Sequence, residues 1–306
     1  MALLDEIKKS YKNGGALFRL IYINIAVFVV VGFLFVLYRL FTPGTSLSQL
    51  RNLYNENFLT YLMVPSLPAE LLRRPWTLIT YMFTHFNLFH ILFNMLVLYW
   101  FGTIFLLYLS RKQLVSTYLI GGLAGAFLYV LFMNGFPGLR EHLGGTMLGA
   151  SAAIMAIVVA ISIYVPNYTI YMLFIGPVRL KYLALGFIVI DILMIASDNA
   201  GGHIAHLGGA LYGYWFITRF RKGRDTGNWL NVLLESIVSV FKPKPKLNVA
   251  YRKGRRFVPD EDFNKRKVTQ QKEIDRILDK IAKAGYESLT KQEKETLFNF
   301  SDKTRH

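Results

Sequence analysis

The chain has 306 residues, of which 53% are hydrophobic and 15% aromatic, and its mean hydropathy is positive. This composition excludes a disordered or fibrous chain, and it is too apolar for one soluble domain. The net charge of +16 is concentrated in the tail, because the residues from Arg219 onward hold 22 basic and 12 acidic side chains. The absence of cysteine excludes disulfides and thiol catalysis. We therefore predict a membrane-embedded body followed by a basic soluble tail.

Six apolar segments have roughly the 20 residues that crossing a bilayer requires. The first, between Arg19 and Arg39, has 19 residues without a charge. Five more follow at 85–107, 113–134, 148–165, 181–197 and 203–218. We predict an all-α membrane protein with a six-transmembrane-helix bundle and a helical cytoplasmic tail. Because the first twelve residues include several charged side chains, we expect no cleavable signal peptide.

Six spans would place both termini on one side of the membrane, and basic residues beside the spans indicate which side. Four basic groups would all be cytoplasmic by the positive-inside tendency. Arg51, Arg73, Arg74 and Arg140 fall on the opposite side, so the bias is incomplete. We predict a multi-pass protein of the cell membrane with cytoplasmic N- and C-termini. The four groups are Lys8, Lys9, Lys12 and Arg19; Arg111 and Lys112; Arg179 and Lys181; and Arg219, Arg221, Lys222 and Arg224.

The same patterns divide the chain into four parts. We predict a cytoplasmic segment at 1–18, the membrane domain at 19–220, an interfacial helix with a basic linker at 221–267, and a small cytoplasmic helical extension at 268–306. The long segment 41–75, between the first two spans, contains prolines and apolar residues. We expect it to be a loop partly folded into the membrane interface.

A serine and a histidine stand in apolar segments, where polar side chains cost free energy. Ser151 follows Gly149-Ala150 at the head of the fourth span, and His206 lies at the head of the sixth. Polar groups inside a membrane indicate a functional site. Both spans would start from the non-cytoplasmic face, with each residue about one helical turn below it. A nucleophile and a base at one depth predict hydrolysis within the membrane.

Small residues recur at every fourth position along these two spans. Such stripes let helices approach closely, so we predict that the fourth and sixth spans pack face to face. His206 lies about 60° around its helix from Gly209, whereas His203 lies about 120° away. We therefore expect His206, and not His203, to face the serine. The stripes are Ala152, Ala156 and Ala160 on the fourth span and Ala205, Gly209 and Gly213 on the sixth.

Asn87, His90 and Asn94 would form one polar row on the second span. The row could hold helices together by hydrogen bonds or donate to a developing oxyanion, and the residues alone leave both open. Metal ligation by histidines is a further alternative. Neither a His-Glu-x-x-His motif nor an acidic ligand pair occurs in these spans, so we expect no metal and no cofactor. Asp191, near the middle of the fifth span, is either a third site residue or a packing partner, and we favour packing.

At these residues the chain resembles the rhomboid family of intramembrane serine proteases, over roughly residues 15–220. The shared motifs are His85-x4-His90-x3-Asn94, Gly149-x-Ser151 and Ala205-His206-x-x-Gly209. The resemblance implies that Ser151 is the nucleophile and His206 its general base, in a dyad without a carboxylate. It also implies an oxyanion hole made by His90, Asn94 and the Ser151 backbone N–H. His85, Gly149, Gly209 and Gly213 would be structural residues near the site.

The chain departs from the family pattern at three places. Ala152 follows the serine where the family often has glycine. Met155 stands where a tyrosine often stacks on the catalytic histidine. The first loop has Trp76-Thr77 instead of a Trp-Arg pair, which removes a cation that organises this loop.

The tail has three recognisable parts. The stretch 229–241 has an apolar stripe typical of an interfacial helix. The basic stretch 242–256 would bind anionic lipid headgroups, and we do not expect nucleic-acid binding. Next comes an amphipathic helix ending before Gly285, then a capping box of Thr290 and Glu293 that opens a last helix. This helical pair resembles the C-terminal extension of some bacterial rhomboids. The sequence leaves open whether it docks on a partner or on the chain itself.

The sequence thus predicts an intramembrane serine endopeptidase that cleaves transmembrane segments of membrane proteins near their outer end, through an acyl-enzyme. The resemblance implies a bacterial member of the family. The alternative is a rhomboid-like pseudoprotease that binds or escorts membrane proteins. Because Ser151 and His206 are both present, we favour the enzyme. A transporter would predict inverted repeats, which the sequence does not show.

Overall fold

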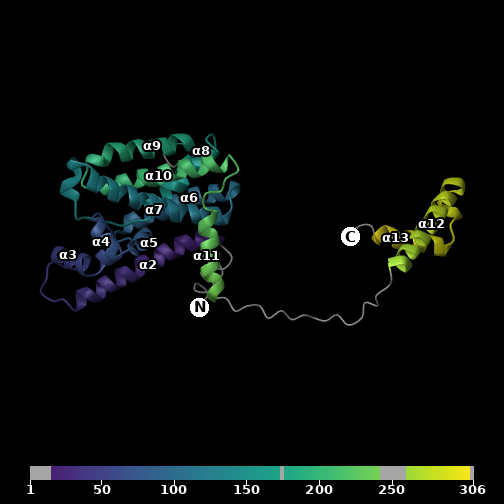
Figure 1. The fold of residues 1–306 in the computed structure, drawn as a ribbon, viewed down its shortest axis with the longest axis horizontal. Helices are drawn as coiled ribbons and strands as arrows, with labels where there is room; N and C mark the ends of the chain where they lie inside the picture. The colour runs from purple at the N-terminus through teal and green to yellow at the C-terminus, as the bar shows by residue number, and fades with distance from the viewer. Residues whose placement is uncertain (1–14, 173–175, 242–259, 304–306) are drawn as a thin grey trace. The chain divides into compact units, whose positions relative to one another are not determined.

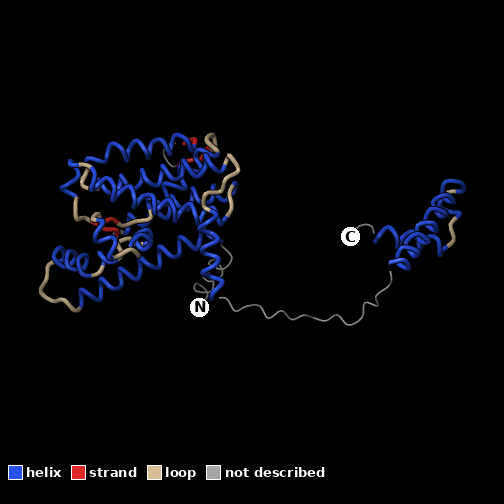
Figure 2. Tube along the Cα trace, in the orientation of Figure 1, coloured by secondary structure: helices blue, strands red, loops and turns tan. Residues whose placement is uncertain are grey.

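The computed structural model describes residues 15–172, 176–241 and 260–303 (Figure 1). The chain divides into two compact units, Met1–Pro243 and Lys244–His306. Helices account for most of the described chain, and two short strand pairs occur in the first unit (Figure 2).

Helices occupy the positions of all six expected spans. They are α2 (Gly15–Leu40), α6 (Leu88–Tyr108), α7 (Arg111–Gly135), α8 (Ser151–Tyr164), α9 (Leu180–Leu193) and α10 (Ala200–Phe220). Among the described residues, α2, α6 and α7 are long and apolar enough to cross a membrane. The 14-residue α8 and α9 would each extend only about 21 Å, against a hydrocarbon core of about 30 Å. The count of six membrane spans therefore stays a prediction.

The segment between α2 and α6 is folded into short elements. They are α3 (Leu47–Asn57), η1 (Leu59–Tyr61), β1 (Val64–Pro65), α4 (Pro68–Arg73), α5 (Thr77–Thr80) and η2 (Tyr81–Phe83). A capping box of Ser46 and Gln49 starts α3, whose Leu50 and Tyr54 are buried. The segment therefore has its own helices and buried residues.

Two short strand pairs accompany the helices of this mostly helical chain. β1 pairs antiparallel with β2 (Thr146–Met147), and β3 (Thr169–Met172) pairs with β4 (Gly176–Arg179). Pairing satisfies backbone groups of the loops that precede and follow α8. Strands of two to four residues leave too little alternation to be read from a sequence. The β1–β2 pair ties the first loop to the residues just before Ser151.

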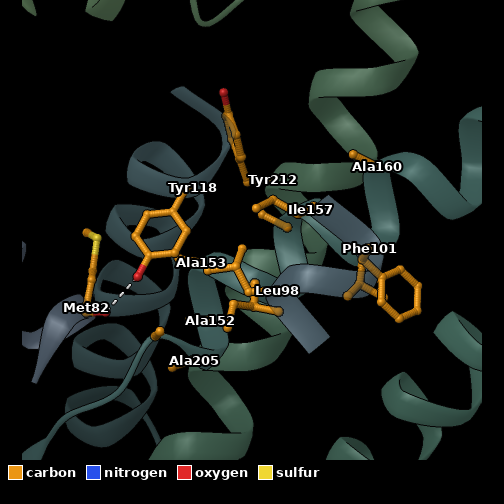
Figure 3. Packing of buried hydrophobic residues seen from close by; sticks show 14 of the residues in the cluster. Met82, Leu98, Phe101, Tyr118, Ala152, Ala153, Ile157, Ala160, Ala205 and Tyr212 are labelled. Carbon is orange, nitrogen blue, oxygen red and sulfur yellow. Dashed lines mark hydrogen bonds between the residues drawn. The ribbon is translucent and has the colours of Figure 1, made fainter. Parts of the chain in front are cut away.

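The centre of the first unit is a close contact of α7, α8 and α10. The contact between α8 and α10 is the one that the small-residue stripes predict, and α7 joins it without having been expected there. A methyl group added to Gly125 of α7 would lie 2.6 Å from Ala152 Cβ and 2.8 Å from the Ala205 carbonyl oxygen. Figure 3 shows Ala152, Ala153 and Ala205 in this core, beside the hydrogen bond from Tyr118 to the Met82 carbonyl. The three backbones meet where only glycine and alanine fit.

Basic flanks of different helices gather at one end of this unit. Arg111, at the start of α7, lies against Gly15 at the start of α2. Gln113 donates to Asp225 just beyond α10, at 3.0 Å. Arg221 donates to the Ile163 carbonyl at the end of α8. Helix α11 (Asn228–Phe241) also contacts α7.

The second unit consists of α12 (Asp260–Ala284), η5 (Tyr286–Ser288) and α13 (Lys291–Lys303). The expected end of the amphipathic helix before Gly285 is confirmed, since α12 ends at Ala284 and Gly285 follows it with φ +76°. The expected capping box is also confirmed, since Thr290 N–H donates to Glu293 at 2.8 Å and Glu293 N–H donates to Thr290 Oγ1. The basic stretch 242–256 lies outside the described residues. The four domain boundaries stay predictions.

Candidate active site

A cavity of about 740 Å³ opens beside the start of α8. Ser151, His206, His90 and Asn94 all line it, although they come from α6, α8 and α10. Thr146 and Met147 of β2, η3 (Pro137–His142) and the residues before α10 complete the wall. The structure therefore brings together the four residues to which the sequence assigns chemistry.

Ser151 is the first residue of α8, and not one turn inside a longer helix. The expected span at 148–165 starts too early, because Gly149 has φ +122°, outside the helical range. Gly149 N–H donates to the Tyr81 carbonyl at 2.9 Å, and no side chain caps α8 at Ala150. Unpaired N–H groups and the positive end of the helix dipole therefore lie beside the Ser151 hydroxyl.

The imidazole of His90 lies next to the serine. A Cβ atom built on Gly149 would be 3.0 Å from His90 Nε2 and 3.7 Å from Ser151 Oγ. Glycine at this position thus serves two purposes: it accepts the positive φ, and it lets His90 approach the backbone beside the nucleophile.

His85 joins Asn94 to the backbone before the serine. Its Nε2 lies 2.9 Å from Asn94 Nδ2 and 3.4 Å from the backbone nitrogen of Ala150. Both partners are donors, so Nε2 is the acceptor. His85 is fully buried, and this contact fixes the amide of Asn94 relative to the start of α8.

Asn87 does not belong to the polar row that its spacing predicts. It is the N-cap of α6, and its Oδ1 accepts from the backbone N–H groups of Phe89 (2.9 Å) and His90 (3.3 Å). The side chain is exposed and bonds to its own helix end. Consequently α6 starts three residues later than expected, at Leu88.

The main correction concerns Asp191. Its Oδ1 lies 2.7 Å from His206 Nδ1 and 2.8 Å from His203 Nδ1, and the residue is only 4% exposed. The sequence favoured a packing role for Asp191; in the structure its carboxylate also hydrogen-bonds both histidines of α10, so His206 has a carboxylate beside it that a dyad would lack. The sequence did contain one signal for a role in the site, because Asp191 is a single acidic residue within an apolar segment. His206 lines the cavity, whereas His203 is not among its lining residues.

Asp191, His203 and His206 together could bind a metal ion, which the sequence did not lead us to expect. One donor atom from each of Asp191, His203 and His206 lies within 4.8 Å of the other two, so the cluster could hold an ion. The observed separations of 2.7 and 2.8 Å are hydrogen-bond lengths. Ligands around a tetrahedral zinc, at about 2.0–2.1 Å from the ion, would be about 3.3 Å apart. The geometry is that of a hydrogen-bonded cluster.

Two departures from the family pattern have structural consequences. Met155 packs with Val159 and Ala210 in a small apolar cluster. In the first loop, Arg74 supplies the organising cation that is absent after Trp76. Its guanidinium donates to Glu70 and to the Thr60 carbonyl (3.0 Å).

Two parts of the chain match known protein families. Residues 72–223 match the Rhomboid domain, and residues 259–303 match a family of unknown function, DUF6576. The chain therefore contains a segment that matches the Rhomboid domain. It is a membrane protein with apolar helices.

Several curated proteins are similar to this chain. RHOMBOID-like protein 12, mitochondrial, of Arabidopsis thaliana is 33% identical over 181 residues, which cover 56% of this chain and 54% of the relative. Presenilin-associated rhomboid-like protein, mitochondrial, of Rattus norvegicus is 36% identical over 147 residues, 44% of this chain and 36% of the relative. Rhomboid protein 1, mitochondrial, of Saccharomyces cerevisiae is 30% identical over 166 residues, 48% and 45% of the two chains.

The chain thus spans about half or less of the length of these relatives. All three names are those of mitochondrial proteins, so they give no support to the bacterial origin that the resemblance implied.

Proposed function

We propose that this protein is an intramembrane serine endopeptidase that cleaves membrane-protein substrates near the outer end of a transmembrane helix. The observation that carries the proposal is the shared cavity, which holds a serine hydroxyl, an imidazole and two further polar side chains at an uncapped helix start. The match of residues 72–223 to the Rhomboid domain supports the reaction class.

In the proposed reaction, Ser151 Oγ attacks the carbonyl carbon of the scissile peptide while its proton passes to His206. The protonated His206 then gives this proton to the leaving amine as the C–N bond breaks, which leaves an acyl-enzyme. Water enters through the cavity and repeats both steps with the ester. No hydrogen bond joins Ser151 and His206 among the described contacts, and the catalytic contact is expected to tighten with substrate bound.

The tetrahedral intermediate carries a negative oxygen that needs donors. The backbone N–H of Ser151 points from the positive end of α8, and His90 lies beside it. Asn94 has two amide hydrogens, one of which is directed to His85, so the other is available to the substrate. Each such donor typically contributes about 10²–10³-fold in rate.

The substrate class follows from the same geometry. A fully hydrogen-bonded helix hides its carbonyl groups, so the cleaved segment has to unwind locally. The proposed substrates are membrane proteins whose transmembrane helix has small or helix-breaking residues near its outer end.

The proposed location is the cell membrane, with both termini in the cytoplasm. Support comes from the basic residues at the helix ends around Arg111 and Arg221, opposite the end at which Ser151 lies. The basic stretch 242–256 is proposed to bind anionic lipid headgroups.

Labelling with a fluorophosphonate tests the function directly, because this probe acylates an activated serine. We expect the wild-type chain to be labelled, and Ser151→Ala and His206→Ala to lose labelling. Ser162→Ala is the matched control, since Ser162 is a buried serine of the same helix outside the cavity. Labelling that survives Ser151→Ala would refute the nucleophile. A well-folded wild type without any labelling would favour the pseudoprotease.

A further inference from the structure

We infer that Asp191 is a positioning residue for His206, so that the site acts through Ser151, His206 and Asp191 together. This inference rests on the proposed function, because it assigns the orientation of the proposed general base. It adds a carboxylate to a site that the family resemblance describes as a dyad.

The hydrogen-bond chemistry determines the tautomer of His206. An ionised carboxylate can only accept, so the 2.7 Å contact requires a proton on His206 Nδ1. In the neutral ring, Nε2 is then the nitrogen with a free lone pair. This is the nitrogen that has to take the Ser151 proton, and the carboxylate therefore prepares the base for the reaction.

Burial strengthens the hydrogen bond between Asp191 and His206. The side chain of Asp191 is 6% exposed and lies on α9, which contacts both α8 and α10. A charge removed from water is stable only when it is paired and hydrogen-bonded. When His206 becomes an imidazolium during acylation, the same carboxylate stabilises the new positive charge. Met155 could not replace it, because a thioether is only a weak acceptor.

His203 also hydrogen-bonds to Asp191 Oδ1, which accepts from both histidines. It lies one turn before His206 on α10, and its Nδ1 is 2.8 Å from Asp191 Oδ1. Unlike His206, it is not among the residues that line the cavity. We assign it to holding the carboxylate in place, and the alternative is that Asp191 serves His203 instead.

The test is the rate of fluorophosphonate labelling of the full chain in detergent, measured as a function of pH. Asp191→Asn is expected to lower the rate by about 10²–10⁴-fold, as expected when a general base loses its tautomer. It is also expected to change the pH profile of labelling, because the carboxylate beside the general base is replaced by a neutral amide. A purely structural role would lower the amount of folded protein without changing this profile.

Three further variants serve as comparisons. Asp225→Asn makes the same chemical change at an aspartate outside the cavity and is expected to leave rate and profile unchanged. Asp191→Glu keeps the charge and is expected to recover part of the rate. His203→Gln is expected to stay within several-fold of the wild type. The other titratable groups facing this region, which are held constant in all variants, are His90, Glu141, His142 and Asp198.

The outcomes separate the two proposals. Wild-type rate and profile in Asp191→Asn, with labelling abolished by Ser151→Ala, would overturn the positioning role and leave the proposed function intact. Labelling that survives Ser151→Ala would overturn the function itself. A loss in His203→Gln equal to that in Asp191→Asn would show that the carboxylate serves His203. If Asp191→Asn does not fold, ¹⁵N-histidine NMR of the wild type decides: an Nδ1–H tautomer at His206 supports the role, and an Nε2–H tautomer overturns it.

Discussion

Gly209 lies where α10 meets the backbone of α8, one turn after His206. A methyl group built there would overlap the Ala152 carbonyl oxygen and lie 2.8 Å from the Ala152 carbonyl carbon. The substitution Gly209→Ala therefore places a carbon against a backbone that cannot rotate away. The two helices have to separate.

The size of the effect follows from these contacts. Carbon atoms pack at about 3.5–4.0 Å, so α8 and α10 have to move apart by at least about 0.7 Å. Overpacking of this kind costs about 3 kcal/mol, and alanine regains about 1 kcal/mol of helix propensity. A net loss of about 2 kcal/mol corresponds to a fall in Tm of about 4–8 °C for a unit of this size. Since α8 carries Ser151 and α10 carries His206, the displacement should lower activity by about 10-fold or more.

Thermal unfolding in detergent and the rate of fluorophosphonate labelling measure the two effects. Gly186→Ala on α9 is the matched control, because a methyl group there meets no atom within 4 Å. We expect the control to keep its activity, with an unchanged or slightly higher Tm. A Gly209→Ala variant that behaves like Gly186→Ala would refute the proposed backbone contact.

Two further predictions concern topology and the second unit. Because the chain has no cysteine, Arg140→Cys and Lys222→Cys can be labelled separately with an impermeant maleimide, and we expect reaction from opposite sides of the membrane; reaction from one side would contradict the predicted orientation. Hydrogen bonds from Lys280, and then from Thr290, lower the pKa of Glu293 from 4.5 to about 2. Because the folded pKa is the lower one, the stabilisation is complete above about pH 4.5 and lost as pH falls toward 2. Hydrogen exchange of α12 and α13 should show this acid dependence in the wild type and not in Glu293→Gln.

Local patterns were sufficient for much of the architecture. The spacing of Gly209 and Gly213 predicted the contact between α8 and α10, because small residues at a helical period mark one face. The capping box of Thr290 and Glu293 also followed from spacing alone. Both are relations within one helix or at its end, where 3.6 residues per turn fixes the geometry.

Contacts between residues on different helices could not be predicted from sequence spacing in this way. Asp191 and His206 are separated by the end of α9, by η4 (Met194–Ala196) and by a turn, so no period relates their directions. Asn87 had the right spacing for the polar row but caps α6, because the start of a helix is decided by competing hydrogen bonds. The positive φ of Gly149, which brings His90 to Ser151, depends on contacts with η2 and α6.

The sequence by itself therefore determined the apolar segments, the small-residue faces and the identity of the serine and histidine. Only the tertiary structure decided that a carboxylate stands behind the histidine and that the serine begins its helix. The physical reason is that a buried charge is tolerated only beside its partners, and packing of three separate helices determines which partners it meets.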